Sequence, residues 1–258
     1  MAVIPGNVRH QAPSAASDRH RRCWLPELLV LTGIALLSTA VFWLTPLDLV
    51  VSEWFRTAKD GIAWPIAQHQ PWLFLNRKGD TWLTVVLISL PVLVLAGGLF
   101  ISRCRTWRRY ALFVLATVIL GPGLLVNVGF KEHLGRPRPT KVEDFGGIHA
   151  YVPPLHIGRA GNNSSFPSGH AASAFCYFSL WFVWRRRYPR LALAAFTGTL
   201  MLGGIMSFSR VAAGAHFLSD VLWSAYLCYF SSFILYYFIL RIPLHEDEDV
   251  KETRKPAF

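Results

Sequence analysis

Long apolar runs separated by short polar segments dominate the chain. Each run is close to the ~20 residues that an α-helix needs to cross ~30 Å of hydrocarbon. The runs lack the alternation of apolar and polar positions that marks a half-buried strand, so they predict membrane helices. The expected fold is therefore an all-α polytopic membrane protein with six transmembrane helices. The spans are predicted at roughly 24–46, 82–102, 109–130, 170–185, 190–208 and 217–240.

Arginines in the connections between the spans indicate how the helices are oriented. They cluster before the first span, after the second and after the fourth: Arg9, Arg19, Arg21, Arg22, Arg103, Arg105, Arg108, Arg109, Arg185, Arg186, Arg187 and Arg190. If the spans alternate in direction, all three clusters lie on one side, which the positive-inside rule assigns to the cytoplasm. Both termini are then expected in the cytoplasm. The predicted division is an N-terminal tail (1–23), a six-helix membrane domain (24–240) and a C-terminal tail (241–258).

The opposite, periplasmic side is expected to receive the segments 47–81, 131–169 and 209–216. Apolar residues interspersed with polar ones in 47–64 leave two interpretations open, an amphipathic surface helix or an ordinary loop. The stretch 140–165 is the longest irregular segment, and loops of this length are often lids or binding surfaces. Its Asn162-Asn163-Ser164-Ser165 contains glycosylation sequons that matter only in a eukaryote, whereas the compact chain is more typical of a bacterium.

Composition agrees with a membrane protein. The chain has 258 residues, of which 53% are hydrophobic and only 16% charged, whereas a soluble domain is nearer 25% charged. The net charge of +11 could suggest nucleic acid, but no basic groove interleaved with aromatic residues is present, and the arginines fit membrane topology better. The four cysteines show neither close pairs nor metal-ligand spacing, which favours structural roles.

Two histidines occur in polar clusters that a membrane segment would not ordinarily contain. His216 precedes Asp220 by four residues, which would place both on one helical face. A carboxylate there can fix the imidazole tautomer and leave the other ring nitrogen as a nucleophile. Taken alone, the pair is more often a structural contact at a helix end. The neighbouring Arg210 and the two other polar clusters favour a catalytic role.

The second histidine, His170, follows Ser168 and Gly169 at the expected start of the fourth span. Serine is typical of a helix N-cap, and free backbone N–H groups at a helix start bind phosphate oxygens. Gly169 would allow close approach of the backbone. His170 could then serve as a general acid. The alternative is a capping serine beside an incidental histidine.

A third cluster, Lys131 to Pro139, supplies fixed cations. Lys131 and Arg138 lie seven residues apart, and Pro137 and Pro139 stiffen the strip. Arginine offers paired donors to phosphate, and lysine a compact charge. A basic membrane-surface patch would explain the charge, but not its position on the side that the charge rule disfavours.

Taken together, the three clusters resemble the motifs of the type 2 phosphatidic acid phosphatase family, whose superfamily includes glucose-6-phosphatase and the vanadium haloperoxidases. The matching pattern is Lys131-x6-Arg138-Pro139, then Pro167-Ser168-Gly169-His170, then Ser209-Arg210-x5-His216-x3-Asp220. The resemblance covers about residues 82–240 and implies the helical core of that family. Arg136 is not a motif position and is expected to be supporting at most.

The resemblance also implies a mechanism. His216 would attack phosphorus to form a phosphohistidine, Asp220 would orient it, and His170 would protonate the leaving oxygen and later activate water. Phosphate oxygens would be bound by Lys131, Ser168, Gly169, Arg138 and Arg210. No cofactor or metal is implied, and no carboxylate cluster in the sequence would hold one.

The expected function is an inner-membrane lipid phosphatase that acts on the periplasmic face. Its partners would be the bilayer and a phosphorylated lipid, with lipid A, undecaprenyl pyrophosphate and phosphatidylglycerophosphate all left open as substrates. The stretch Phe145-Gly146-Gly147 is similar to the lipid A phosphatase branch. Two alternatives remain: a vanadate-dependent haloperoxidase, disfavoured by the apolar spans, and a non-enzymatic lipid-phosphate transporter, disfavoured because no inverted repeat is visible.

Overall fold

A computed structural model describes residues 15–57, 63–157 and 164–253, with the side chains of 15–23, Arg103 and 248–253 excepted. The sequon residues Asn162 and Asn163, and much of the two predicted tails, therefore lie outside the described residues. The α-helices are α1 (Ala15–Leu44), α2 (Leu47–Glu53), α3 (Trp72–Phe74), α4 (Asp80–Phe100), α5 (Ser102–Arg105), α6 (Arg108–Val118), α7 (Glu132–Leu134), α8 (Gly169–Phe175), α9 (Phe178–Trp184), α10 (Pro189–Ala212), α11 (Leu218–Ile234) and α12 (Ile242–Thr253).

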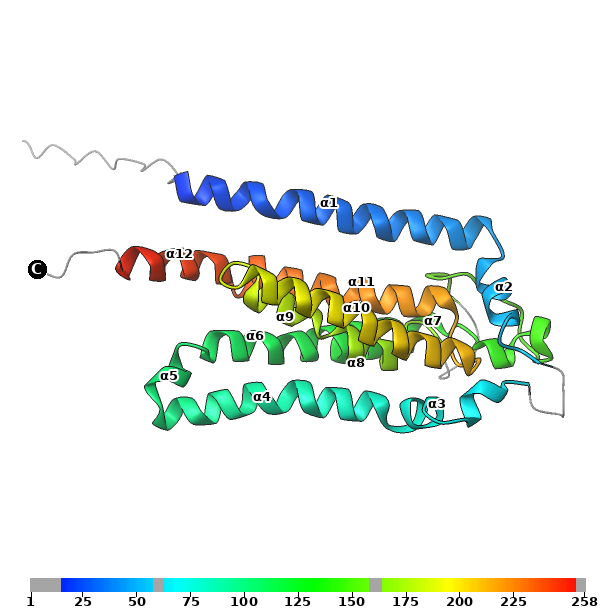
Figure 1. The fold of residues 1–258 in the computed structure, drawn as a ribbon. Helices are drawn as coiled ribbons and strands as arrows, with labels where there is room; N and C mark the ends of the chain where they lie inside the picture. Colours follow the sequence, from blue (N-terminus) through cyan, green and yellow to red (C-terminus); the bar gives the residue numbers. More distant parts are fainter. Residues whose placement is uncertain (1–14, 58–62, 158–163, 254–258) are drawn as a thin grey trace, which may run out of the picture.

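Shorter helical turns connect or extend these elements: η1 (Pro65–Gln68), η2 (Leu75–Gly79), η3 (Ile119–Lys131), η4 (Pro139–Lys141), η5 (Glu143–Phe145) and η6 (Leu235–Ile239). Within the described ranges there is no strand, only one isolated bridge between Val142 and His149. The predicted all-α fold is confirmed. Its long helices lie side by side in one elongated bundle, with α1 along one flank and α4 along another (Figure 1).

Five stretches are long and apolar enough to cross a bilayer among the residues that the structure describes: Trp24–Leu44, Trp72–Phe100, Arg108–Lys141, Pro189–Ala212 and Leu218–Ile239. The chain is thus a multi-pass membrane protein. The predicted fourth span instead forms two consecutive short helices, α8 and α9, separated by a turn at Cys176-Tyr177. A total of six spans therefore stays a prediction. Leu36, Leu93 and Phe100 are exposed on the long helices, as side chains facing lipid would be.

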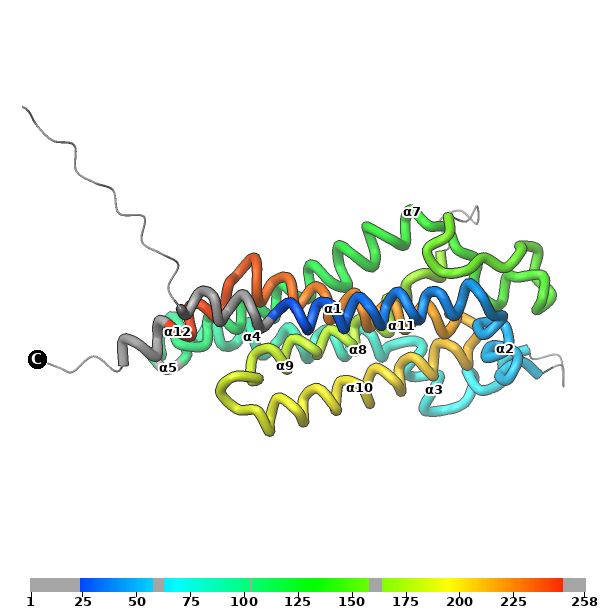
Figure 2. Tube along the Cα trace, turned by 90° about the horizontal axis from the view of Figure 1, so that it is seen from above, coloured from blue at the N-terminus to red at the C-terminus, as the bar shows by residue number. Residues whose placement is uncertain are grey.

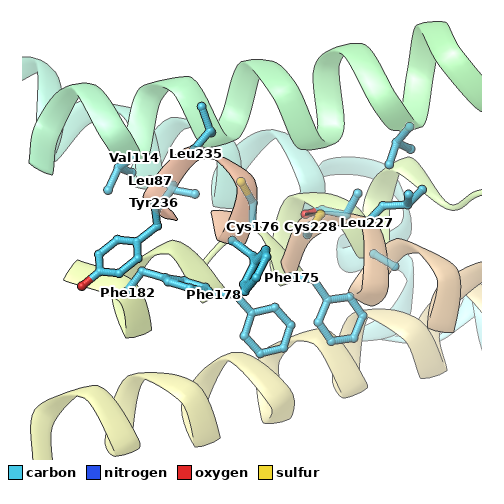
Figure 3. Packing of buried hydrophobic residues seen from close by; sticks show 14 of the residues in the cluster. Leu87, Val114, Phe175, Cys176, Phe178, Phe182, Leu227, Cys228, Leu235 and Tyr236 are labelled. Carbon is cyan, nitrogen blue, oxygen red and sulfur yellow. Dashed lines mark hydrogen bonds between the residues drawn. The ribbon is translucent and has the colours of Figure 1, made fainter. Parts of the chain in front are cut away.

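The core of the bundle is aromatic. Phe113, Phe182 and Tyr236 are almost fully buried, with ring centroids 5.2–6.3 Å apart, within the range of favourable aromatic pairs. Figure 3 shows Phe182 and Tyr236 together with Phe178 and the small side chain of Cys176 between the helices. Since α8 and α9 contribute most of their side chains to this core, their burial explains why a segment too short to be a clear span is still held inside the bundle.

The third predicted span continues from α6 into the π-helix η3, which contains Pro122. Proline lacks the N–H that an α-helix would use at that position, and a π-helix is one way to accommodate the interruption. The side chain of Asn127 donates to the carbonyl of Pro122 at 2.7 Å. This π-helix carries the chain toward Lys131, its last residue.

Within segment 47–64, the described residues 47–57 and 63–64 contain one helix, the seven-residue α2. Its buried side chains are Asp48, Val51 and Ser52, so the helix turns a largely polar face inward. Val50 and Trp54 are exposed on the other side, so a surface helix in this region stays a prediction. The polar face of α2 contacts the start of α11 and the side chain of Arg136, as described below.

The two ends of the bundle differ in character. The start of α1, the helices α5 and α12 and the turn between α9 and α10 lie toward one end, whereas α2, α3 and α7 lie at the other (Figures 1 and 2). The arginine-rich connections therefore share the first end, called here the basic end. The second end, called here the motif end, holds the loops between η3 and α8 and between α10 and α11.

Candidate active site

Three chain segments far apart in sequence converge at the motif end. They are the strip after η3, the turn before α8 and the connection between α10 and α11. A fourth segment, η2 with the first turn of α4, adds Asn76 and Asp80. The structure therefore brings together all three clusters that the sequence singles out, and adds residues that the motifs do not contain.

His216 is almost completely buried, with 2% of its surface exposed. Its Nδ1 lies 2.6 Å from the carbonyl oxygen of Ser165. Because a carbonyl can only accept, Nδ1 carries the proton, and Nε2 is left with its lone pair. The ring is therefore held in the tautomer that a nucleophile attacking through Nε2 requires.

The turn that presents His216 depends on Gly214, whose φ is +62°. A Cβ at this position would lie 2.4 Å from the ring of Trp64, so both the backbone conformation and the packing require glycine. The amide of Thr140 also donates to the Gly214 carbonyl at 3.1 Å. The loop after the Arg138 motif is thereby tied to the loop that carries the histidine.

The expectation that His216 and Asp220 share one helical face is wrong, because α11 begins only at Leu218. Asp220 instead lies in the first turn, where its Oδ2 accepts from the backbone N–H of Phe217 at 2.8 Å. The same Oδ2 is 3.6 Å from Nδ1 of His216, longer than a hydrogen bond. Asp220 thus faces the imidazole as a nearby charge, while Ser165 provides the hydrogen bond that fixes the ring.

The surroundings of His216 keep the imidazole neutral. Burial lowers its pKa to about 4; the charges of Arg210 and Arg138 act in the same direction, and Asp220 opposes them. Desolvation disfavours the charged imidazolium, and nearby cations add to that effect. At neutral pH the ring is therefore an uncharged base with an available lone pair.

His170 lies at the start of α8, as predicted. The hydroxyl of Ser168 caps this helix by accepting from the N–H of Ala171 at 3.3 Å. Nε2 of His170 is 3.1 Å from the carbonyl oxygen of Asn76 and 3.5 Å from Oδ1 of Asp80. This ring is partly exposed, in contrast to His216, so it remains accessible to a substrate and to water.

The predicted phosphate-binding cations are also brought together. Lys131, Arg138 and Arg210 are close enough to act on one another electrostatically. In the described part of the chain no carboxylate forms an ion pair with any of them. Such a concentration of unpaired positive charge is costly unless an anion joins it.

Buried donors without partners point in the same direction. Nε of Arg138, Nε of Arg210 and Nδ2 of Asn76 have no hydrogen-bond partner among the described residues, and each such atom carries a desolvation cost. Oδ1 of Asn76 accepts from Nη1 of Arg210 at 2.9 Å, which holds these two side chains together. A phosphate group offers the acceptor oxygens that this set of donors lacks.

Arg136, expected to be supporting at most, is the centre of a buried network that the motifs do not reveal. Its side chain has no exposed surface. It forms ion pairs with Oδ1 of Asp220 and, at 2.8 Å, with Oδ2 of Asp48 on α2. Nη1 also donates to the hydroxyl of Ser219 at 2.8 Å, and Nε donates to the carbonyl of Val152 at 2.7 Å.

Sequence reasoning missed Asp48, Asn76 and Asp80. All three lie in the segment 47–81, whose only visible signal is a set of charged and amide residues beside predicted spans. Their contacts with the residues of the site join positions 88 to 171 residues apart, and the Asp48–Ser219 bond spans the longest separation. No periodicity in the chain indicates such a pairing.

The arrangement offers a buried neutral imidazole, a second accessible imidazole and several unpaired cations. These are the parts needed to bind a phosphoryl group, attack it and protonate what leaves. Within the residues that the structure describes, no group of three or more histidine, cysteine, aspartate or glutamate side chains has the arrangement of a metal site.

Comparison with known proteins agrees with this arrangement. The model of the PAP2 superfamily matches residues 109–243. A lipid A 4'-phosphatase from Francisella tularensis subsp. novicida is 36% identical over 152 residues, which cover 58% of this chain and 68% of the relative. Phosphatidylglycerophosphatase B from Bacillus subtilis is 29% identical over 192 residues, covering 72% and 81% respectively.

A solved structure has the same fold. The crystal structure of a transmembrane PAP2-type phosphatidylglycerolphosphate phosphatase from Bacillus subtilis superposes with a TM-score of 0.51 at 24% sequence identity. The superposition covers 88% of this chain and 98% of that one. At this identity the likeness supports the helical arrangement alone.

Proposed function

This chain belongs to the PAP2 superfamily and is a membrane lipid phosphatase, and we propose that it removes a phosphate monoester from lipid A on the periplasmic face through a phosphohistidine intermediate. The observation that carries the proposal is the cluster of unpartnered buried donors on Arg138, Arg210 and Asn76 beside the buried neutral His216. A cation-rich pocket with a nucleophile at its base fits a phosphoryl group.

In the first half-reaction, the lone pair on Nε2 of His216 attacks phosphorus, and the bond from phosphorus to the lipid oxygen breaks. His170 gives its proton to that oxygen as it leaves. Lys131, Arg138 and Arg210 bind the three remaining phosphoryl oxygens, where charge develops in the transition state. Backbone donors at Gly169 and the Ser168 hydroxyl would complete the cradle.

In the second half-reaction, His170 accepts a proton from water, and the water oxygen attacks phosphorus on His216. The bond between phosphorus and Nε2 breaks, inorganic phosphate leaves, and His216 returns to its neutral state. Asp220, 3.6 Å from Nδ1, stabilises the positive charge that the ring bears while it is phosphorylated. His170 therefore serves as the acid in the first half-reaction and as the base in the second.

An apolar groove supports a substrate with hydrocarbon chains. It has a volume of about 630 Å³ and lies between α4, α6 and the α8–α9 pair, lined by Leu87, Val94, Trp107 and Leu180 among others. The residues that line it come mostly from α4, α6 and α9, so the groove runs along the bundle where hydrocarbon chains could lie. One of these helices, α4, carries Asp80 in its first turn, near His170.

Placement of the site on the periplasmic face is supported by the two ends of the bundle. Arginine-rich connections share the basic end. The connection between α10 and α11, which carries His216, lies toward the motif end. Positive charge in short connections favours the cytoplasmic side, which supports a periplasmic motif end. Lipid A as the substrate rests on the similarity to the Francisella enzyme, which carries that activity in its name.

The test is phosphate release by the purified protein in detergent with EDTA present. Lipid A, phosphatidylglycerophosphate, undecaprenyl pyrophosphate and phosphatidate are compared, each with His216→Ala as control. We expect release from lipid A and its loss in the variant, by a factor on the order of 10⁴ or more. Release that persists in His216→Ala would contradict the nucleophile assignment.

Phosphatidylglycerophosphate is the second candidate substrate, because the similarity to the Bacillus phosphatase covers more of both chains. The panel separates the two candidates directly. Vanadate separates the phosphatase from the haloperoxidase alternative, because it should inhibit the former and activate the latter. Activation of halide oxidation by vanadate would contradict the proposed function.

A further inference from the structure

We infer that Asp48, contributed by α2 from outside the part of the chain that matches the family model, is a positioning residue that keeps a net negative charge beside the nucleophile His216. The inference deepens the proposed function and rests on it. The residues 109–243 that match the PAP2 model contain both histidines and all the predicted cations. Asp48 lies 61 residues before that range begins.

Asp48 makes four polar contacts and has no exposed surface. Its Oδ1 accepts from the Ser219 N–H at 2.9 Å, and its Oδ2 accepts from the Ser219 hydroxyl at 2.5 Å. Oδ2 also accepts from Nη2 of Arg136 at 2.8 Å and from the Tyr151 hydroxyl at 3.1 Å. A carboxylate that accepts from this many donors is fixed in position.

The charges in this network do not balance. Two buried carboxylates, Asp48 and Asp220, share the single guanidinium of Arg136, so the formal sum is −1. Arg136 is further fixed over the ring of Phe217, with 4.5 Å between Cζ and the ring centroid. An excess buried charge is costly, which calls for a reason beyond stability.

The geometry supplies that reason. The excess charge reaches His216 through Asp220, whose Oδ2 is 3.6 Å from Nδ1, on the side of the ring away from the Nε2 that attacks. If Arg136 paired with Asp220 alone, the pair would be neutral and would contribute little to a positive ring. Asp48 takes part of the charge of Arg136, so Asp220 stays available to stabilise the imidazolium of the phosphorylated state.

A purely structural role would not need this charge. Asp48 also accepts from the buried N–H of Ser219 in the first turn of α11, where a helix leaves its N–H groups without internal partners. A neutral asparagine or serine caps a helix about as well as aspartate does. Capping alone therefore leaves the negative charge unexplained. The experiment must therefore separate the capping role of Asp48 from the effect of its charge.

The first variant is Asp48→Asn, which keeps the shape and the capping oxygen but brings the network to a formal charge of zero. We expect kcat to fall by roughly tenfold to hundredfold, the range typical when a group that orients a functional histidine is removed, with KM nearly unchanged. Vanadate, which binds as a five-coordinate mimic on Nε2, should inhibit more weakly by a similar factor. Competition by inorganic phosphate, which the cations bind, should be unaffected.

The second variant is the double change Asp48→Asn with Arg136→Gln, which restores the sum of −1 through Asp220 alone. If charge is what matters, the double variant recovers part of the activity that Asp48→Asn loses. A structural role predicts the opposite, because two buried polar partners are then missing. Glu53→Gln, an exposed position on the same helix, is the matched control and should retain wild-type kcat.

The outcomes separate cleanly. A double variant no more active than Asp48→Asn overturns the inference, as does Asp48→Asn with wild-type kcat. Failure of Asp48→Asn to fold, monitored by thermal unfolding in detergent, also overturns it and assigns the residue to stability. If the wild-type protein releases no phosphate from any lipid in the panel, the proposed function fails instead.

Discussion

At each end of the bundle an arginine is paired with carboxylate oxygens. Arg136 is fully buried and Arg185 partly buried, and the two networks differ in how they are completed. At the basic end, Arg185 pairs with both carboxylate oxygens of Glu27 at 2.8–3.0 Å, and the hydroxyls of Tyr229 and Tyr237 donate to the same carboxylate. One positive charge meets one negative charge. Every acceptor oxygen of Glu27 is used, and the guanidinium rests on surrounding aromatic rings.

At the motif end the charges do not balance, and some hydrogen-bonding groups are unused in the described part of the chain. Two carboxylates share Arg136. Among the described residues, no partner accepts from Nε of Arg138, Nε of Arg210 or Nδ2 of Asn76. A network whose charges balance and whose donors and acceptors are all used joins helices. Unbalanced charge and unused donors instead indicate a site where another molecule binds. Substitutions at the motif end should therefore lower activity more than stability, and substitutions at the basic end should lower stability more than activity.

The largest difference is expected from Arg210→Gln. Removing this cation takes away a donor for the phosphoryl oxygens and should lower kcat/KM by roughly 10²–10³-fold. The charge of Arg138 acts against that of Arg210, while Asp80 acts in its favour. Because repulsion by Arg138 is the larger of these two effects, the melting temperature should stay the same or rise.

Phosphate release and thermal unfolding of the same preparation check this prediction. Arg187→Gln, at the basic end, is the control and should change neither quantity appreciably. If Arg210→Gln unfolds at a clearly lower temperature while keeping its activity, the two ends do not differ in the way described.

The reciprocal result is expected from Glu27→Gln. This change leaves the Arg185 guanidinium without its charged partner and weakens the acceptor for two tyrosine hydroxyls, so the free energy of unfolding should fall by roughly 1–3 kcal/mol. The turnover number of the folded protein should be unaltered, because Glu27 lies at the other end of the bundle. Denaturant unfolding in detergent and kcat measure the two effects.

Glu143→Gln is the matched control for that experiment. Glu143 is exposed at the motif end, and a surface change of this kind should shift stability by less than about 0.5 kcal/mol. A loss of turnover in folded Glu27→Gln would mean that the basic end is coupled to catalysis after all.

A smaller effect is expected from pH. Burial lowers the pKa of His216 to about 4, whereas an unfolded chain binds the proton near pH 6.5. As the pH falls from 6.5 toward 4, the unfolded state gains a proton that the folded state does not, so stability is lost in this window. At pH 5 the loss relative to pH 7 should be roughly 2 kcal/mol.

His216→Asn removes this titration. The variant should therefore lose less stability than the wild type between pH 7 and pH 5, and the difference between their melting temperatures should narrow or reverse over that range. Parallel curves for the two proteins would show that the imidazole of the folded protein titrates normally, contrary to the buried neutral state described here.

Much of this architecture could be predicted from the chain. Apolar runs of about 20 residues indicate the long helices because a helix satisfies every backbone hydrogen bond within one such segment. The two short helices α8 and α9 could not be predicted in the same way. They are stabilised by burial of their side chains in the aromatic core, whereas a long apolar run is what indicates the other spans. The start of α8 at Gly169 could be predicted because a serine cap acts locally.

The site could be predicted only as far as its motifs extend. Lys131, His170 and His216 stand in recognisable local patterns, and the structure brings them to one end of the bundle. Asp48 and Arg136 could not be paired in advance, because their contact depends on how α2 lies against α11. The helical pairing of His216 with Asp220 was wrong because Gly214 turns the chain before the helix begins.

The most direct test of the account is to find where the phosphoryl group resides during turnover. Lipid A is mixed with the wild-type protein, the reaction is quenched in alkali during turnover, and the peptides are analysed by mass spectrometry. We predict phosphate on His216 and no phosphorylated peptide in a parallel sample of His216→Ala. Phosphate on another residue, or lipid A turnover that continues in His216→Ala, would contradict the central claim that the incomplete network at the motif end is a phosphoryl-transfer site built around His216.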